Sequence, residues 1–133
     1  MTTQSIAEAC VLHVFCKQTK EYLNQLKMGA LAELAGDEKN GEGSRTFVFT
    51  NEGHTLGNAL KTIIARYPEV DFCGYTIPHP TEQKLHFRIQ SHRDRAIDIL
   101  KRGLEDLEGL CDHTIVTFEK EMADFNAVKV ENT

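Results

Sequence analysis

The last third of the chain carries one uninterrupted helical pattern, and this pattern limits the folds that the chain can adopt. No proline occurs between residues 91 and 125, and apolar residues recur there at spacings of three and four. Such periodicity predicts a single amphipathic helix, about 45 Å long at 1.5 Å per residue. The apolar positions are Ile97, Leu100, Leu104, Leu107, Cys111, Phe118, Met122 and Phe125, with Thr114 as the polar exception.

A helix of this length cannot be covered by the domain that carries it. A compact domain of 133 residues has a radius of gyration of about 14 Å, so the end of the helix must extend beyond the core. An apolar stripe that continues past the core marks an interaction surface. The pattern therefore predicts that the chain pairs with a second chain through its C-terminal helix, whose start we place at a capping box formed by Ser91 and Asp94.

Three segments before this helix have the pattern of strands. Residues 45–50 place Phe47 and Phe49 on one face, and residues 84–90 alternate with Leu85, Phe87 and Ile89 inward. Residues 70–77 are rich in aromatic and β-branched residues, and the stiff turn Pro78-His79-Pro80 follows them. Together these segments predict a small antiparallel sheet and an α+β fold.

A shorter helix is predicted between the first two of these strands. Thr55 is a suitable N-cap, and Pro68 marks the end because the residue before a proline is disfavoured in helical geometry. Gly57 inside this helix predicts that another element approaches its backbone closely, and Gly103 in the long helix invites the same interpretation. Gly109 has no such explanation. The apolar stripe of the shorter helix consists of Leu56, Leu60, Ile63 and Tyr67.

The chain is expected to form one domain, over residues 28–125. Residues 36–44 are polar and glycine-rich, which is typical of an exposed loop. Residues 1–27 show only weak helical spacing, so we treat them as an N-terminal extension of unknown role that pairing does not require. Residues 126–133 are expected to form a C-terminal tail.

The net charge of the chain and the spacing of its cysteines argue against some classes of function. The net charge of −5 repels a phosphate backbone, so direct nucleic-acid contact is not expected. The four cysteines lack the paired short spacing of a zinc site. The sequence shows no recognisable secretory signal and no bilayer-spanning run. We therefore expect reduced thiols in a cytosolic or nuclear protein. These cysteines are Cys10, Cys16, Cys73 and Cys111.

The sequence contains no convincing catalytic, metal or cofactor site. His54 lies beside Asn51 and Glu52, but no nucleophile or metal set converges on it, and a structural role at the start of the shorter helix is the better interpretation. Residues 53–57 lack the spacing of a phosphate-binding loop. We therefore expect neither enzymatic activity nor a cofactor.

Two long motifs and the terminal helix give the chain a family resemblance. The stretch Gly53-His-Thr-Leu-Gly-Asn-Ala-Leu-Lys61 resembles the signature of the α-like subunits of DNA-dependent RNA polymerases. The segments at residues 71–80 (DFCGYTIPHP) and 85–90 (LHFRIQ) resemble most closely the small α-like subunits shared by RNA polymerases I and III. Residues 103–107 and 110–112 of the long helix fit the same group, in the same order along the chain.

This resemblance implies a dimerisation domain whose two helices pack against those of a larger α-like subunit. The resulting heterodimer would be the platform for the large catalytic subunits of polymerases I and III, in the nucleus including the nucleolus, and a strand at residues 29–35 would pair with residues 45–50. The partner-binding residues would be Leu56, Leu60, Ile63, Tyr67, Leu100, Leu104, Leu107, Cys111, Phe118 and Met122. The motif residues with structural roles would be His54, Thr55, Gly57, Asn58, Gly74, Tyr75, Pro78, His79 and Pro80.

Other interpretations remain open at this point. The paralogous small α-like subunit of RNA polymerase II is the nearest alternative within the family. A dimeric ligand-binding regulatory module would share the early order of elements, but it needs a closing strand after the second helix. A small homodimeric enzyme would need a convergent polar pocket.

Overall fold

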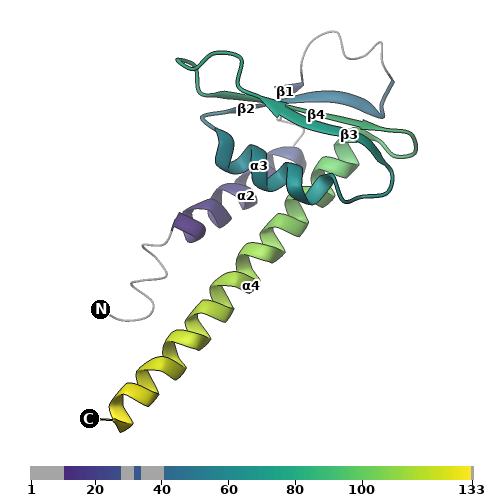
Figure 1. The fold of residues 1–133 in the computed structure, drawn as a ribbon. Helices are drawn as coiled ribbons and strands as arrows, with labels where there is room; N and C mark the ends of the chain where they lie inside the picture. The colour runs from purple at the N-terminus through teal and green to yellow at the C-terminus, as the bar shows by residue number, and fades with distance from the viewer. Residues whose placement is uncertain (1–10, 28–31, 34–40, 133) are drawn as a thin grey trace.

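The computed structural model describes residues 11–27, 32–33 and 41–132 of the chain. The elements follow the order α2 (Val11–Lys27), β1 (Ala32–Glu33), β2 (Ser44–Thr50), α3 (His54–Ile64), β3 (Val70–Thr76), β4 (Lys84–Ser91) and α4 (Ala96–Glu131). Within this described part, the strands form one antiparallel sheet in the order β1-β2-β4-β3 (Figure 1). The α+β class predicted from the sequence is confirmed.

Alternation along the central strands creates the apolar face of the sheet. Phe47 pairs with Phe87 and Phe49 pairs with Leu85 across β2 and β4, and all four side chains are fully buried. Residues two apart on a strand point to the same face, so this pairing gathers four large apolar groups on one side. The inward positions predicted for these two strands are therefore confirmed.

The described helices lie on one side of the sheet (Figure 1). Helix α3 follows β2 and packs against β3, while α4 begins beneath the sheet and then leaves it. The core between these layers also contains Leu60 of α3 and Leu100 of α4, both fully buried. Helix α4 has 36 residues that span about 54 Å, and it begins and ends later than predicted. It continues to Glu131, so the prediction of a C-terminal tail from residue 126 is wrong.

Helix α2 was not predicted as a packed element, yet it lies against α4. Cys16, Thr19, Tyr22 and Leu23 are buried, and the Tyr22 ring meets the Phe49 ring edge-on with centroids 5.1 Å apart. The part of the N-terminal extension at residues 11–27 is therefore a helix that covers the core. Its role in pairing stays a prediction, and Cys10 lies outside the described residues.

Both predicted helix caps are wrong. Helix α3 begins at His54 with Gly53 as its N-cap, and α4 begins at Ala96 with Arg95 as its N-cap, neither with a side-chain cap hydrogen bond. The Ser91 hydroxyl instead accepts hydrogen bonds from the backbone N–H groups of residues 93 and 94. It closes a turn before α4, because its own residue still belongs to β4 and pairs with Val70.

The strand implied by the family resemblance is present at β1. Ala32 and Glu33 pair antiparallel with Val48 and Phe47, although alanine and glutamate favour a helix by propensity. The tertiary pairing therefore overrides the local preference. The rest of the predicted strand, at residues 29–31 and 34–35, lies outside the described part of the chain. Among the helices that the structure describes, none is both long and apolar enough to cross a membrane.

Candidate dimerisation surface

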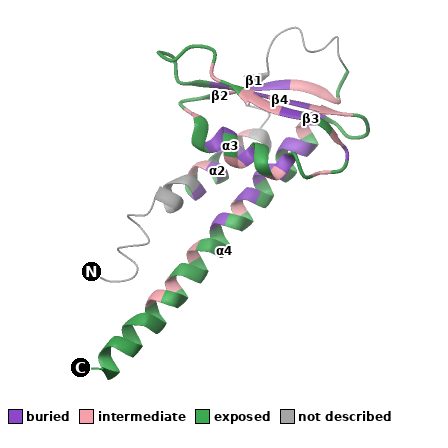
Figure 2. Ribbon diagram, in the orientation of Figure 1, coloured by how far each residue is buried: buried purple, intermediate pink, exposed green. Residues whose placement is uncertain are grey.

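The second half of α4 carries an exposed apolar stripe, which we name the distal stripe and define as Phe118, Met122 and Phe125. Phe118 is 44% exposed and Phe125 is 62% exposed, while Met122 is partly buried. These residues repeat at spacings of four and three, so they share one face of the helix. Figure 2 shows that this half of α4 extends away from the sheet and is mostly exposed. The predicted overhang is therefore present.

The first half of α4 buries the same stripe within the chain. Leu100, Leu104, Leu107 and Cys111 are at most 2% exposed. The change occurs after Cys111, because every later residue that the structure describes is exposed or only partly buried. In this conformation, a partner can reach the distal stripe directly but not the buried half.

The predicted partner-binding residues in and just after α3 divide in the same way. Leu56 and Leu60 are buried in the core, whereas Ile63 and Tyr67 pack against the core and stay partly accessible. Six of the ten predicted residues thus belong to the interior of this chain: Leu56, Leu60, Leu100, Leu104, Leu107 and Cys111. A contact between any of the ten and a partner stays a prediction.

Polar contacts join the segment after α3 to α4. The Tyr67 hydroxyl donates a hydrogen bond to Asp106, and the Arg102 guanidinium lies 3.8 Å from the centroid of the Tyr67 ring. Arg102 also forms an ion pair with the buried Glu69. Burial, and next the hydrogen bond to Asp106, raise the pKa of Tyr67 to about 12. Tyr67 therefore stays protonated and acts as a donor from this segment to α4.

Helix α2 contacts α4 at the point where burial ends. The Cys16 thiol donates a hydrogen bond to Asp112 over 3.1 Å, and Lys20 lies 3.6 Å from Glu108 and 3.7 Å from Asp112. Burial, then the hydrogen bond and negative charge of Asp112, raise the pKa of Cys16 to about 11. Nearby, Tyr22 donates a 2.7 Å hydrogen bond to Glu52, and its pKa is raised chiefly by burial.

The histidine–glycine motif at residues 53–61 has a structural role. His54 Nδ1 lies 3.0 Å from the Tyr75 hydroxyl, and their rings meet edge-on with centroids 5.7 Å apart. A Cβ added at Gly57 would lie 2.7 Å from the Tyr75 ring, so only glycine lets β3 approach α3 this closely. The close approach predicted at Gly57 is present, and a structural role for His54 stays a prediction.

The other predicted motif residues lie around this contact or on the surface. Gly74 of β3 leaves room for the Phe72 ring, which would lie 3.0 Å from a Cβ at that position. Asn58 is exposed, and its carbonyl oxygen accepts a hydrogen bond from Thr62. The remaining motif residues are all exposed, namely Thr55, Pro78, His79 and Pro80.

Gly103 explains how the two core helices cross. A Cβ at this position would lie 2.6 Å from Ile64 and 3.4 Å from Leu60 of α3. The absence of a side chain therefore allows close helix packing, as predicted. At Gly109 an added Cβ would meet nothing within 4 Å, so no contact within the described chain requires that glycine.

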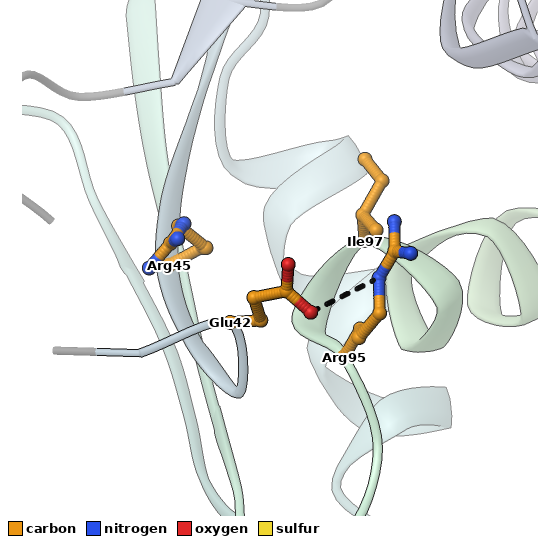
Figure 3. A pocket seen from close by; sticks show the side chains of 4 residues that line it. All are labelled: Glu42, Arg45, Arg95 and Ile97. Carbon is orange, nitrogen blue, oxygen red and sulfur yellow. Dashed lines mark ion pairs between the residues drawn. The ribbon is translucent and has the colours of Figure 1, made fainter. Parts of the chain in front are cut away.

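One small hollow of the surface lies where a loop meets the start of α4. Figure 3 shows one of about 110 Å³ between Glu42, Arg45, Arg95 and Ile97. Arg95 lies 3.7 Å from Glu42 and 3.6 Å from Asp98, while the Glu42 carbonyl accepts the first backbone N–H of α4. These contacts hold the loop against the helix start. Among the described residues, no group of three or more histidine, cysteine or acidic side chains could hold a metal ion.

Comparison with known proteins identifies the domain from which α4 extends, and the match ends before the distal stripe. The model of the RNA polymerase Rpb3/Rpb11 dimerisation domain matches residues 44–117, which is more than half of the chain. The chain belongs to this family. The match covers the sheet from β2 onward, α3 and the first part of α4, whereas α2 lies outside it.

Several relatives carry the same name. The "DNA-directed RNA polymerases I and III subunit RPAC2" of Drosophila melanogaster is 97% identical over 105 residues, covering 79% of this chain and all of that protein. The protein of that name from Schizosaccharomyces pombe is 49% identical over 59% of this chain and 64% of its own length. Subunit L of the DNA-directed RNA polymerase of Thermoplasma acidophilum shares the fold, with a TM-score of 0.60 and 22% identity over 73% of this chain and 92% of that chain.

The sequence prediction missed α2 as part of the core. Cys16, Thr19 and Leu23 are buried and recur at spacings of three and four, which is a helical period. Two of these three residues are small and only weakly apolar, so the stripe does not stand out. Counting small residues as possible core positions would have revealed the helix.

Proposed function

We propose that this chain is the small α-like subunit of RNA polymerases I and III and that it pairs with the larger α-like subunit through α4. The observation that carries the proposal is the exposed distal stripe on a helix that begins inside a dimerisation domain. Two phenylalanines exposed on one face of a helix are costly in water, since burying each contributes about 1.5–3 kcal/mol. A partner helix supplies that burial.

The relatives support polymerases I and III over polymerase II. The subunits named for polymerases I and III reach 97% identity in Drosophila melanogaster and 44% over 70% of this chain in Danio rerio. A relative named "Probable DNA-directed RNA polymerase II subunit RPB11" is 42% identical over 52% of this chain. The higher identity and coverage favour the shared subunit.

The function is then assembly rather than catalysis. The heterodimer would form the platform for the large catalytic subunits in the nucleus, including the nucleolus, for synthesis of ribosomal RNA precursors and small RNAs such as 5S RNA and tRNA. The net charge of −5 is consistent with a subunit that contacts protein rather than nucleic acid.

Affinity purification of the tagged full-length chain from cells tests the proposal. We expect the larger α-like subunit and the largest subunits of polymerases I and III to be recovered by mass spectrometry, with polymerase II left behind. The double variant Phe118→Asp/Phe125→Asp should lose all of them, and Glu105→Gln on the exposed face of α4 should lose none. Recovery of polymerase II subunits in comparable amount would overturn the assignment to polymerases I and III.

A further inference from the structure

Helix α2 covers a part of the matched domain although it lies outside that domain itself. Leu107 and Cys111 fall within the matched residues 44–117, and both are 2% exposed. They belong to the same buried cluster as Cys16, Tyr22 and Leu23 of α2. An element outside the dimerisation domain therefore occupies the apolar face of α4 inside that domain.

The covered face and the distal stripe form one continuous surface. Leu107, Cys111, Phe118, Met122 and Phe125 follow the three-and-four spacing of one helical face, interrupted only at Thr114. Figure 2 shows burial in the part of α4 near α2 and exposure beyond it. A partner helix that runs along the distal stripe toward the sheet meets α2 at Cys111.

The two phenylalanines of the distal stripe supply only part of a stable interface. An aromatic side chain buries about 150–250 Å², so Phe118 and Phe125 together supply at most about 500 Å². A stable interface buries about 800 Å² on each partner. Adjacent apolar surface on this face of α4 lies on both sides of the stripe, at Val128, which is 56% exposed, and beneath α2.

The contacts that hold α2 on α4 are of a kind that a partner can replace. The ion pair of Lys20 with Asp112 is solvent-exposed, with 49% and 53% of the two side chains accessible, and exposed pairs contribute little. In the pair with Glu108, the Glu108 side chain is 28% accessible. Within residues 16–25, the part of α2 whose burial the structure describes, the buried side chains are Cys16, Thr19, Tyr22 and Leu23. A partner helix with an apolar stripe can cover the same face of α4.

We propose that α2 is an intramolecular cap on the dimerisation surface, and that a helix of the larger α-like subunit takes its place on Leu107 and Cys111 when the heterodimer forms. This inference rests on the proposed function. The cap keeps part of the apolar face out of water while the chain is alone, and its displacement extends the distal stripe toward the sheet.

A cross-link between α2 and α4 in the full-length chain tests the cap. The Cys16 thiol lies 3.1 Å from Asp112 Oδ1, so Asp112→Cys places a second thiol within reach of a disulfide to Cys16. Peptide mapping confirms that this pair has formed. Binding to the purified larger α-like subunit is then measured for the oxidised and reduced forms. Asp112→Ser is the matched control, because it removes the same carboxylate without a cross-link.

We expect the oxidised Asp112→Cys form to bind at least about tenfold more weakly than its reduced form. Asp112→Ser should bind equally under both conditions. Equal binding of the oxidised and reduced Asp112→Cys forms would overturn the cap and leave the proposed function standing. If wild type and every reduced form fail to bind the larger α-like subunit, the proposed function falls and the cap falls with it.

Hydrogen exchange on the wild-type chain gives a second, independent measurement. If the partner displaces α2, the backbone amides of residues 11–27 should exchange at least about tenfold faster in the heterodimer than in the free chain. The amides of residues 112–131 should become slower, because the partner covers that half of α4. Unchanged or slower exchange in α2 on binding would overturn the cap.

Discussion

The two halves of α4 have the same sequence pattern and opposite environments. Residues 96–111 include seven buried positions, whereas none of the described residues after 111 is buried. The apolar spacing of three and four is nevertheless the same in both halves. This contrast shows that an apolar stripe indicates which face of a helix is buried against another element. The neighbouring elements decide whether that face is part of a core or of an interface.

The neighbours of the first half are α3, α2 and the sheet. Helix α3 reaches α4 through the gap at Gly103, and α2 contacts it at Glu108 and Asp112. The second half has no such neighbours among the described residues. A substitution in the first half should therefore change the stability of the chain, and one in the second half should change pairing.

The largest effect is expected at Leu107, in the buried half. Leu107→Asp removes a core leucine, which costs about 2–5 kcal/mol, and leaves an unpaired charge in an apolar site, which costs more. Because most domains are stable by about 5–15 kcal/mol, the variant should be largely unfolded by circular dichroism. A folded variant that fails only in pairing would show that Leu107 contributes more to the interface than to the stability of the free chain.

The opposite result is expected at the distal stripe. Phe118→Asp should leave the free energy of unfolding of the isolated chain within about 0.5 kcal/mol of wild type, as for other exposed positions. Affinity for the larger α-like subunit should fall by about a hundredfold, or about 2.8 kcal/mol. Urea unfolding and a binding titration separate the two quantities. A large loss of stability would place Phe118 in contact with its own chain.

A smaller loss is expected where glycine permits close contact. Gly57→Ala would place a Cβ 2.7 Å from the Tyr75 ring, and overpacking of this kind costs about 1–3 kcal/mol. Urea unfolding should show this loss although alanine is the better helix former. If the substitution stabilises the chain instead, the Tyr75 ring moves aside without cost, and close packing does not explain the glycine at position 57.

Alkaline pH should weaken the contact between α2 and the buried half of α4. The pKa of Cys16 is raised from 9.0 to about 11, so the folded chain holds the thiol proton more tightly than the unfolded chain. The resulting stability is fully present below about pH 9 and is lost as the pH rises toward about 11. The free energy of unfolding of the wild-type chain should fall as the pH rises across this range, and Cys16→Ser should make this fall smaller. If the free energy falls equally in both proteins, the Cys16 thiol does not contribute to the contact between α2 and α4.

How far the sequence predicts this molecule depends on how local each signal is. The alternation around Phe87 and the long stripe of α4 repeat over many residues, so these strands and the existence of the helix were predicted correctly, whereas both ends of α4 lie further along the chain than predicted. The caps at Thr55 and Ser91 were wrong because a suitable residue near a helix start does not show where the backbone turns. Ser91 is held by β4 and accepts turn hydrogen bonds instead.

The candidate surface was predictable only as a stripe. Leu107 and Phe118 look alike in the sequence, and nothing local shows that one lies in a core and the other in water. That difference depends on α2, whose small buried residues Cys16 and Thr19 give a weak pattern. The family resemblance supplied the strand at β1, which propensity alone would have assigned to a helix.

The smallest effect is expected at Gly109, close to the boundary between the two halves of α4. A Cβ there meets nothing within 4 Å, and alanine is better than glycine inside a helix by about 1 kcal/mol. Gly109→Ala should therefore stabilise the isolated chain by up to that amount in urea unfolding. Ala123→Gly, in the exposed half of the same helix, is the reverse control and should cost a similar or smaller amount.

The same variant also shows how close the partner comes to this side of α4. Gly109 lies about half a turn away from the face that carries Leu107 and Cys111, since successive residues are about 100° apart around the helix. If the partner covers only the stripe, Gly109→Ala should leave affinity unchanged. A loss of about tenfold or more would mean that the partner's backbone approaches Gly109 closely. The interface would then wrap around α4 at the point where its own chain stops covering it.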